Sequence, residues 1–199
     1  SFMKTQIVLA TQNRHKVKEI KSILCDLENI EVLDLSNFPE MGPVDEDAKT
    51  LEGNAIKKAK AVFEHTKILS LADDTGLFVD YLLGEPGVYS SRYAGENVSY
   101  EENNKKLLNA LKGVPPRKRT ACFKCCVALY SKEIQKTFIG ITEGKILFSP
   151  RGENGFGYDP LFLPDGYDKT YAEMSEEEKN KVSHRYKALL LAKDFLKSI

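Results

Sequence analysis

Two adjacent carboxylates, Asp73 and Asp74, follow the short apolar run at residues 68–72. A brief apolar run that ends in polar turn residues predicts a buried strand, and open α/β sheets bind ligands at the carboxyl ends of their strands. Because a carboxylate is costly to desolvate, the pair must meet water, a cation or hydrogen-bond donors. A divalent metal with an activated water would satisfy this need and also provide chemistry. The simpler alternative is a solvated turn.

The second candidate is the stretch at residues 11–16, where a predicted strand leads into a predicted helix. A helix N-terminus binds anions because its first N–H groups are free and its dipole end is positive. The polar and basic side chains of this stretch are Thr11, Gln12, Asn13, Arg14, His15 and Lys16. They predict a phosphate site, with a capped helix start and solvated basic residues as the alternative. The stretch is not a Walker loop.

The third candidate is the glycine-rich stretch at residues 152–160, which places Phe156 and Tyr158 next to glycines. Glycines allow tight turns around exposed aromatic faces. A planar ligand can stack on such a ring while backbone groups bind its edge. The alternative is a surface loop that its aromatic residues merely anchor.

Composition and charge argue against several classes of function. Lysine plus arginine and aspartate plus glutamate each number 29 in 199 residues, so no global charge favours nucleic acid or a membrane surface. No apolar stretch reaches transmembrane length, and the N-terminus lacks a signal-peptide pattern. We therefore expect a cytoplasmic enzyme or binding protein without a nucleic-acid or membrane partner, in one domain over residues 1–199.

The cysteines do not predict a metal site. Cys122, Cys125 and Cys126 lie in the strand-like segment at residues 120–130, and Cys25 stands apart. A strand points residues three apart to opposite faces, whereas a zinc knuckle needs a tight turn between its ligands. We expect these thiols to pack in the core.

Strand and helix patterns alternate along the chain and predict an α/β fold. Predicted strands cover residues 6–11, 31–35, 68–72, 120–130, 134–148 and 161–163, with a turn at 142–145. Predicted helices begin near residue 16, after a cap at Thr50, and at capping boxes that open with Ser99 and Ser175, with a break at 183–185. The elements predict a mixed twisted sheet flanked by helices, in two lobes with a cleft between them.

Four motifs resemble those of the inosine triphosphate pyrophosphatase family, the non-canonical purine nucleoside-triphosphate pyrophosphatases. They are T-Q-N-R-H-K at 11–16, L-A-D-D-T-G-L at 71–77 with G-E-P-G-V-Y-S-S-R-Y-A-G-E after it, G-F-G-Y-D-P-L-F at 155–162, and E-K-N-K-V-S-H-R at 178–185. The motifs follow the family's order and span nearly the whole chain. The resemblance implies an elongated mixed sheet, two lobes with a substrate cleft, and a homodimer. It also implies hydrolysis of ITP, dITP and XTP to the monophosphate and pyrophosphate, with Mg²⁺.

The resemblance also implies roles for individual residues. Asp74 would be the general base and a metal ligand, and the second metal carboxylate would be Glu46, with Asp45 and Glu40 as alternatives. The T-x-N-x-x-K block would bind phosphate, residues 156–159 would bind the base, and the C-terminal motif would add further contacts. The implied substrate-binding residues are Thr11, Gln12, Asn13, Arg14, His15, Lys16, Thr75, Phe156, Gly157, Tyr158, Asp159, Lys179, His184 and Arg185.

Selectivity would depend on the six-position of the purine. Hypoxanthine and xanthine present an oxygen there, which donors such as Arg185, His184 and backbone N–H groups would favour over the amino group of adenine. The chain departs from the family at Gln12, where glycine is usual, and Gln12 would be strained if the position requires a positive φ.

Two other functions remain open at this point. One is a Maf-like nucleotide pyrophosphatase with another base preference, although the S-x-S-x-R-R type of opening motif is absent from the chain. The other is a non-catalytic nucleotide sensor, which would not require the carboxylates.

Overall fold

The strands form one mixed sheet in the computed structural model, which describes residues 3–199. The strands are β1 (Thr5–Leu9), β2 (Ile30–Asp34), β3 (Ser70–Val79), β4 (Pro86–Gly87), β5 (Thr120–Tyr130), β6 (Gln135–Ile146) and β7 (Phe162–Pro164). Their order is β2-β1-β3-β5-β6-β7, and β4 pairs with β3. β1 is parallel to β2 and β3, whereas β4 and β7 are antiparallel to their partners β3 and β6. The predicted mixed α/β sheet is therefore confirmed.

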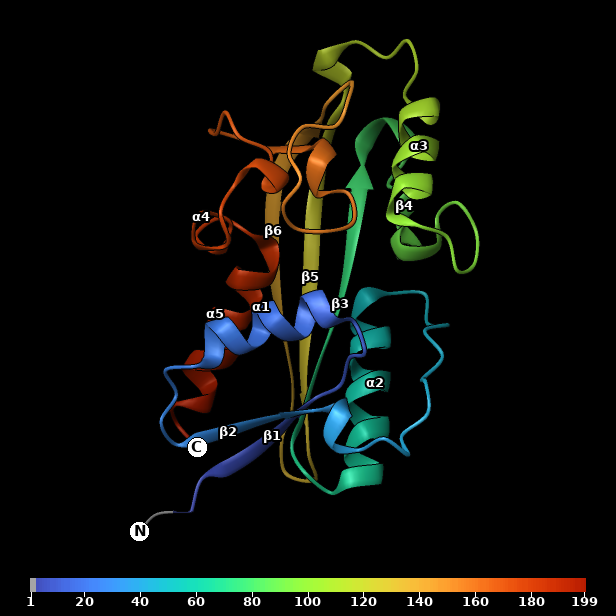
Figure 1. The fold of residues 1–199 in the computed structure, drawn as a ribbon. Helices are drawn as coiled ribbons and strands as arrows, with labels where there is room; N and C mark the ends of the chain where they lie inside the picture. Colours follow the sequence, from blue (N-terminus) through green and yellow to red (C-terminus); the bar gives the residue numbers. More distant parts are fainter. Residues whose placement is uncertain (1–2) are drawn as a thin grey trace. The chain divides into compact units, whose positions relative to one another are not determined.

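Helices accompany the strands at the predicted places (Figure 1). They are α1 (Arg14–Leu24), α2 (Leu51–Thr66), α3 (Tyr100–Ala110), α4 (Glu176–Asn180) and α5 (His184–Leu196). The predicted caps at Thr50, Ser99 and Ser175 each accept a hydrogen bond from a backbone N–H in the first turn. α1 begins two residues earlier than predicted because Asn13 caps it. A break separates α4 from α5, but it covers residues 181–183, because α5 begins at His184, inside the predicted break at 183–185.

Contacts divide the chain into two compact units. Unit 1 comprises Ser1–Asp74, Cys125–Gly140 and Arg185–Ile199, and unit 2 comprises Thr75–Lys124 and Ile141–His184. The long strands β3, β5 and β6 contribute residues to both units.

The core of unit 1 packs strands against helices. Figure 1 shows α1 and α5 together on one face of these strands and α2 on the other. The buried members of the strands and of α1 and α5 include Ile7, Leu9, Leu71, Val127, Ile20, Leu24 and Leu189. Burial of this many aliphatic side chains provides the main stabilisation of the unit.

The core of unit 2 contains both aliphatic and aromatic side chains. Leu107 of α3 and Leu111, which caps the end of that helix, pack there with Leu77 of β3. Phe123 of β5 meets the ring of Phe162 edge-on, with a centroid separation of 4.7 Å. These contacts fix α3 and β7 relative to the strands of the same unit.

Two predicted turns are wrong, and in both cases a glycine lies inside a strand. β3 continues through Asp73, Asp74 and Gly76, and β6 continues through the predicted turn at 142–145. A Cβ on Gly76 would lie 2.4 Å from a carbonyl oxygen of β4, and a Cβ on Gly144 would lie 2.4 Å from one of β7. These glycines therefore allow a neighbouring backbone to approach closely. The turn that joins β5 to β6 lies at Ser131–Ile134 and is closed by a 2.7 Å backbone hydrogen bond.

Two of the four cysteines pack in the core as predicted, whereas Cys122 of β5 is only half-buried and Cys25 is exposed. Cys125 and Cys126 are buried in the strand, and burial raises the pKa of the Cys126 thiol to about 12. A protonated, buried thiol packs as a small apolar side chain. Within residues 3–199, no helix is long and apolar enough to cross a membrane.

Candidate active site

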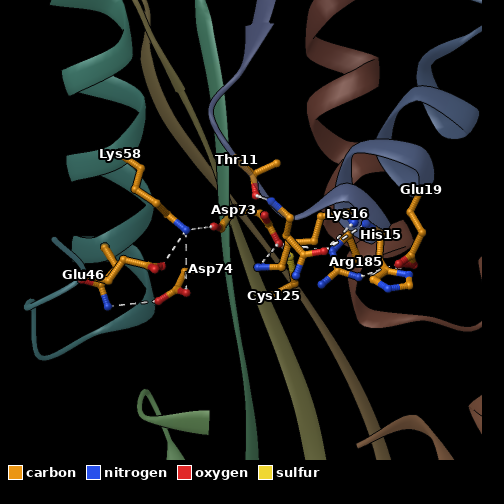
Figure 2. Close-up of polar contacts among 12 residues, drawn as sticks. Thr11, His15, Lys16, Glu19, Glu46, Lys58, Asp73, Asp74, Cys125 and Arg185 are labelled. Carbon is orange, nitrogen blue, oxygen red and sulfur yellow. Dashed lines mark hydrogen bonds and ion pairs between the residues drawn. The ribbon is translucent and has the colours of Figure 1, made fainter. Parts of the chain in front are cut away.

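Asp73 and Asp74 lie inside β3, just beyond the last residues of β1 that pair with it. β1 pairs through Leu9 with Leu71, so β3 extends past the point where the chain leaves β1 for α1. Successive side chains of a strand point to opposite faces. The two carboxylates accordingly have separate sets of partners within unit 1 (Figure 2).

Asp74 faces α2 and the loop that precedes it. Asn54 of α2 donates a 3.1 Å hydrogen bond to Oδ2 of Asp74. Lys58, one turn later, places its Nζ 4.0 Å from Oδ1 of Asp74, 2.8 Å from Glu46 and 2.6 Å from the carbonyl oxygen of Asp73. Lys58 thus joins the acidic loop to the strand that carries both aspartates.

The pKa of Asp74 is raised to about 6. Burial is the main cause, the positive charges of Lys58 and Lys16 oppose it, and the negative charge of Glu46 adds to it. A carboxylate with a pKa near 6 can hold or release a proton close to neutral pH, which suits a general base.

A magnesium ion fits the chemistry of this set. Mg²⁺ takes oxygen ligands and usually needs only one or two carboxylates, with waters and phosphate oxygens completing its shell. Glu46 and Asp74 provide two carboxylates, and both lie within 4.0 Å of the ammonium group of Lys58. No cluster of three or more His, Cys, Asp or Glu that could bind a metal occurs in residues 3–199. Glu40, an alternative for the second metal carboxylate, lies 2.8 Å from Nε2 of His65.

Asp73 faces α1 and α5 instead. Its Oδ2 lies 3.2 Å from Nε of Arg185, 3.4 Å from Nζ of Lys16 and 3.8 Å from Sγ of Cys125. Arg185 also contacts Glu19 of α1 at 3.0 Å. The cations Lys16, Arg185 and Lys58 hold the pKa of Asp73 well below its usual range although it is fully buried. Asp73 therefore stays ionised and holds the start of α1 and the start of α5 (Figure 2).

The stretch between β1 and α1 is a capped helix start. Oδ1 of Asn13 accepts hydrogen bonds from the backbone N–H groups of His15 and Lys16, and Oγ1 of Thr11 accepts one from Asn13. The exposed side chain of Arg14 lies 3.8 Å from Asp34, at the end of β2. The non-glycine residues with positive φ in the described chain are Lys67, Leu83 and Asn97. Gln12 is not among them, so its backbone does not have the strain that a positive φ at this position would cause.

The glycine-rich loop belongs to unit 2 and is anchored at several points. Asp159 accepts hydrogen bonds from Nζ of Lys179 at 2.7 Å and from the backbone N–H of Phe156 at 3.0 Å. The same ammonium group lies 5.0 Å from the centre of the Phe156 ring. Tyr158 is buried and donates a 2.6 Å hydrogen bond to the carbonyl of Ser90. Of the two aromatic residues predicted to be exposed, only Phe156 is partly accessible.

His184 lies in an aromatic stack of unit 2. Its ring is nearly parallel to Phe123, with centroids 4.5 Å apart, and Nδ1 lies 3.3 Å from the hydroxyl of Tyr171. Only 3% of His184 is exposed. Thr75, the first residue of unit 2, is half-buried in β3.

Comparison with known proteins assigns a family. Residues 7–195 match the model of the Ham1 family. The chain belongs to the Ham1 family.

Two relatives that match this Ham1 chain over almost its full length have the same name. A protein of Geobacter sulfurreducens is 51% identical over 193 residues, and one of Thermoanaerobacter pseudethanolicus is 46% identical over 191 residues. Both matches cover 96% of each chain, and both relatives are named dITP/XTP pyrophosphatase. The solved structure of a HAM1 protein from Coxiella burnetii is 39% identical, covers 98% of this chain and 100% of its own, and superposes with a TM-score of 0.89.

The predicted residues of the Ham1 chain fall into two sets, one in each unit. Unit 1 holds the set that the resemblance linked to phosphate and metal, together with Arg185. Its members are Thr11, Gln12, Asn13, Arg14, His15, Lys16, Glu46 and Asp74. Unit 2 holds the residues linked to the base, Phe156, Gly157, Tyr158 and Asp159, together with Thr75 and the C-terminal substrate contacts Lys179 and His184.

Sequence reasoning missed Lys58 and Asn54, which lie on α2 of the Ham1 chain four residues apart. They are 9% and 1% exposed, and they share the buried face of the helix with Ala55 and Ala59. A lysine and an asparagine at helical spacing within an apolar stripe predict a buried polar partner. This pattern was visible in the sequence. The buried polar partners are Asp73 and Asp74.

Proposed function

We propose that this protein hydrolyses non-canonical purine nucleoside triphosphates, namely ITP, dITP and XTP, to the nucleoside monophosphate and pyrophosphate. The observation that carries the proposal is Asp74, a buried carboxylate with a pKa raised to about 6 beside Lys58 and Glu46. The dITP/XTP pyrophosphatases that resemble the chain over almost its full length support the choice of substrate. The Maf-like and sensor alternatives gain no support from these relatives.

Asp74 would act as the general base. It takes a proton from a water molecule whose oxygen attacks the α-phosphorus of the substrate. The bond from the α-phosphorus to the bridging oxygen then breaks, and pyrophosphate leaves with that electron pair. The ammonium group of Lys58 holds Glu46 and the backbone of Asp73 in place, and it keeps the pKa of Asp74 from rising further.

Mg²⁺ is the cofactor that we infer, and Asp74 and Glu46 are the residues that would hold it. When bound, it would neutralise the phosphate oxygens and the charge that develops on the departing pyrophosphate. Glu46 is preferred over Asp45 and Glu40 because Glu46 shares Lys58 with Asp74.

The triphosphate would be bound by the start of α1. Asn13 already uses its Oδ1 as the helix cap, which leaves its side-chain amide donors for phosphate oxygens. Lys16 lies on the first turn of the same helix, and its side chain is 15% exposed. Thr11, Gln12, Arg14 and His15 would contribute to the same anion site by their position at the N-terminus.

The purine would be bound by the unit 2 set. Phe156 offers a ring face, and the cation of Lys179 lies against that ring and on Asp159. Hydrogen-bond donors from this set would favour the six-oxygen of hypoxanthine or xanthine over the amino group of adenine. A buried donor left unpaired against the wrong base can discriminate by ~10⁴-fold or more.

One assay tests the proposal. Pyrophosphate release is measured with ITP, dITP and XTP in the presence of Mg²⁺, beside GTP, ATP and dUTP. We expect kcat/KM for the first three to exceed that for ATP by at least ~10²-fold. Binding of ITP without release of pyrophosphate would favour the sensor, and preference for another base would favour the Maf-like alternative. Light scattering tests the homodimer, and cell fractionation tests the cytoplasmic location, which the resemblance and the sequence led us to infer.

A further inference from the structure

Asn104 of α3 makes a contact with the glycine-rich loop that neither the sequence motifs nor the proposed mechanism uses. Its side-chain Nδ2 donates a 3.1 Å hydrogen bond to the carbonyl oxygen of Gly157, and 9% of the residue is exposed. Both residues belong to unit 2. The carbonyl acceptor fixes the orientation of the amide, because only its NH₂ group can donate.

The amide of Asn104 is only half satisfied. Its Oδ1 is buried, and no residue among 3–199 donates a hydrogen bond to it. A buried acceptor without a donor is unfavourable for folding. Asparagine is also a weaker helix former than leucine, and the apolar side chain of Leu107 lies on the buried side of the same helix. These two effects would favour leucine at this position. The hydrogen bond from Asn104 to Gly157 therefore needs an explanation other than the stability of the helix.

Gly157 is a point at which the loop changes direction. Its φ is +63°, and it separates the partly accessible ring of Phe156 from the buried ring of Tyr158. The carbonyl that Asn104 binds belongs to the peptide between Gly157 and Tyr158, so the hydrogen bond restricts the glycine that links the ring of Phe156 to that of Tyr158. Glycine adopts this left-handed conformation readily but also adopts others. A hydrogen bond from another element, here α3, restricts this freedom.

α3 approaches the loop with a second residue of the same face. Tyr100 lies four positions before Asn104, and residues at this spacing are neighbours on a helix. The centroids of the Tyr100 and Phe156 rings are 6.1 Å apart. The side chain of Asp159 accepts a hydrogen bond from the backbone N–H of Phe156. Phe156 is thus contacted both by its own loop and by α3.

We propose that Asn104 is a positioning residue for the purine base of the substrate. It holds the peptide of Gly157 so that the face of Phe156 is preorganised for a planar purine before the substrate arrives. This inference rests on the proposed function, because it concerns the base-binding role of the same loop. It predicts that Asn104 acts on base binding and leaves the chemistry at the phosphates unchanged.

The test compares Asn104→Leu and Asn104→Asp with the wild-type protein. Both variants remove the NH₂ donor, the first with an apolar side chain and the second with a side chain of the same shape. Asn109→Asp is the matched control, because Asn109 is an exposed residue of the same helix. The measurements are KM and kcat for ITP, the Kd for IMP by calorimetry, and the thermal midpoint of unfolding.

We expect both Asn104 variants to raise KM for ITP and Kd for IMP by roughly fivefold to tenfold, with kcat within about twofold of wild type. The midpoint of unfolding of Asn104→Leu should equal or exceed that of wild type, and Asn109→Asp should change none of the constants. A merely structural role would instead lower the midpoint of Asn104→Leu and reduce kcat in proportion.

The outcomes separate this inference from the proposed function. A wild-type protein that leaves ITP intact would overturn the proposed function, and IMP binding would still report on Asn104. If the wild-type protein is active but the Asn104 variants bind IMP and ITP as it does, the positioning role alone is overturned.

Discussion

Asp73 and Asp74 are consecutive residues of β3, yet their carboxylates meet opposite electrostatic surroundings. Asp73 contacts Lys16 and Arg185, and these cations hold its pKa well below the usual range. Burial instead raises the pKa of Asp74 to about 6. The alternation of a strand therefore divides one acidic pair into a permanently charged anchor and a group that can exchange a proton.

The first prediction concerns Asp74 as the general base. Asp74→Asn keeps the shape of the side chain but removes its ability to take a proton, so kcat for ITP should fall by at least ~10²-fold with a modest change in KM. Pyrophosphate release under saturating Mg²⁺ provides the measurement. Asp165→Asn, on an exposed residue of unit 2, should retain the wild-type rate. An unchanged rate in Asp74→Asn would remove Asp74 from the chemistry.

The second prediction concerns the two charged neighbours that set the pKa of Asp74. Lys58 lowers this pKa and Glu46 raises it. Lys58→Met should therefore move the pKa of Asp74 above 6, whereas Glu46→Gln should move it below 6. Carbon-13 NMR titration of the aspartate carboxyls in metal-free protein measures both shifts, and Asp74→Asn assigns the signal. Shifts of the same sign in the two variants would contradict the arrangement of charges described here.

The sequence predicted the order of the elements and the capped helices because those depend on local patterns. Thr50 and Ser175 cap helices where the pattern placed them, and the apolar stripe of α2 faces inward. The fold class also followed, because alternating strands and helices allow few arrangements.

The sequence could not show that glycines inside β3 and β6 allow the backbone of a neighbouring strand to approach closely. Gly76 and Gly144 have turn-like neighbours, and only the contact with a neighbouring strand distinguishes the two uses. For the same reason Asp73 and Asp74 were expected after a strand, although they lie within one. Lys58 was missed because its partners are Glu46 and the backbone of Asp73, which are 12 and 15 residues away along the chain.

The third prediction is that Asp74 reduces the stability of the metal-free protein. The pKa of Asp74 is about 6 in the folded state, and an aspartate in an unfolded chain titrates near 3.9. Between these values the folded state holds the proton more tightly, so the free energy of unfolding falls as pH rises from about 4 to about 6 and stays low above it. Asparagine has no ionisation to suppress.

Asp74→Asn should therefore unfold at a higher free energy than wild type at pH 7 in EDTA, by on the order of 1–3 kcal/mol. The gain should shrink toward pH 4, where both side chains are neutral in the folded state. Urea unfolding at both pH values measures the difference. A variant that is less stable than wild type at pH 7 would show that burial of Asp74 carries no such penalty.

The fourth prediction concerns Arg185, which the sequence linked to recognition of the base. In the structure its guanidinium group is 2% exposed and contacts both Asp73 and Glu19, which are themselves buried. Arg185→Ala leaves these two carboxylates without that cation, and breaking a buried ion pair in this way typically costs about 3–5 kcal/mol. Arg117→Ala, on an exposed arginine of unit 2, should change stability by less than about 0.5 kcal/mol.

Selectivity separates the two roles of Arg185. If Arg185 only holds Asp73 and Glu19, then Arg185→Lys, which keeps the charge, should recover much of the stability and should retain the preference for ITP over ATP. If the guanidinium group also donates to the six-oxygen, Arg185→Lys should recover stability but lower the ITP-to-ATP ratio of kcat/KM, because lysine lacks the planar fork of donors. We expect the first result, because the side chain is buried against Asp73 and Glu19; a lower ratio in a folded Arg185→Lys protein would show that Arg185 also contacts the base.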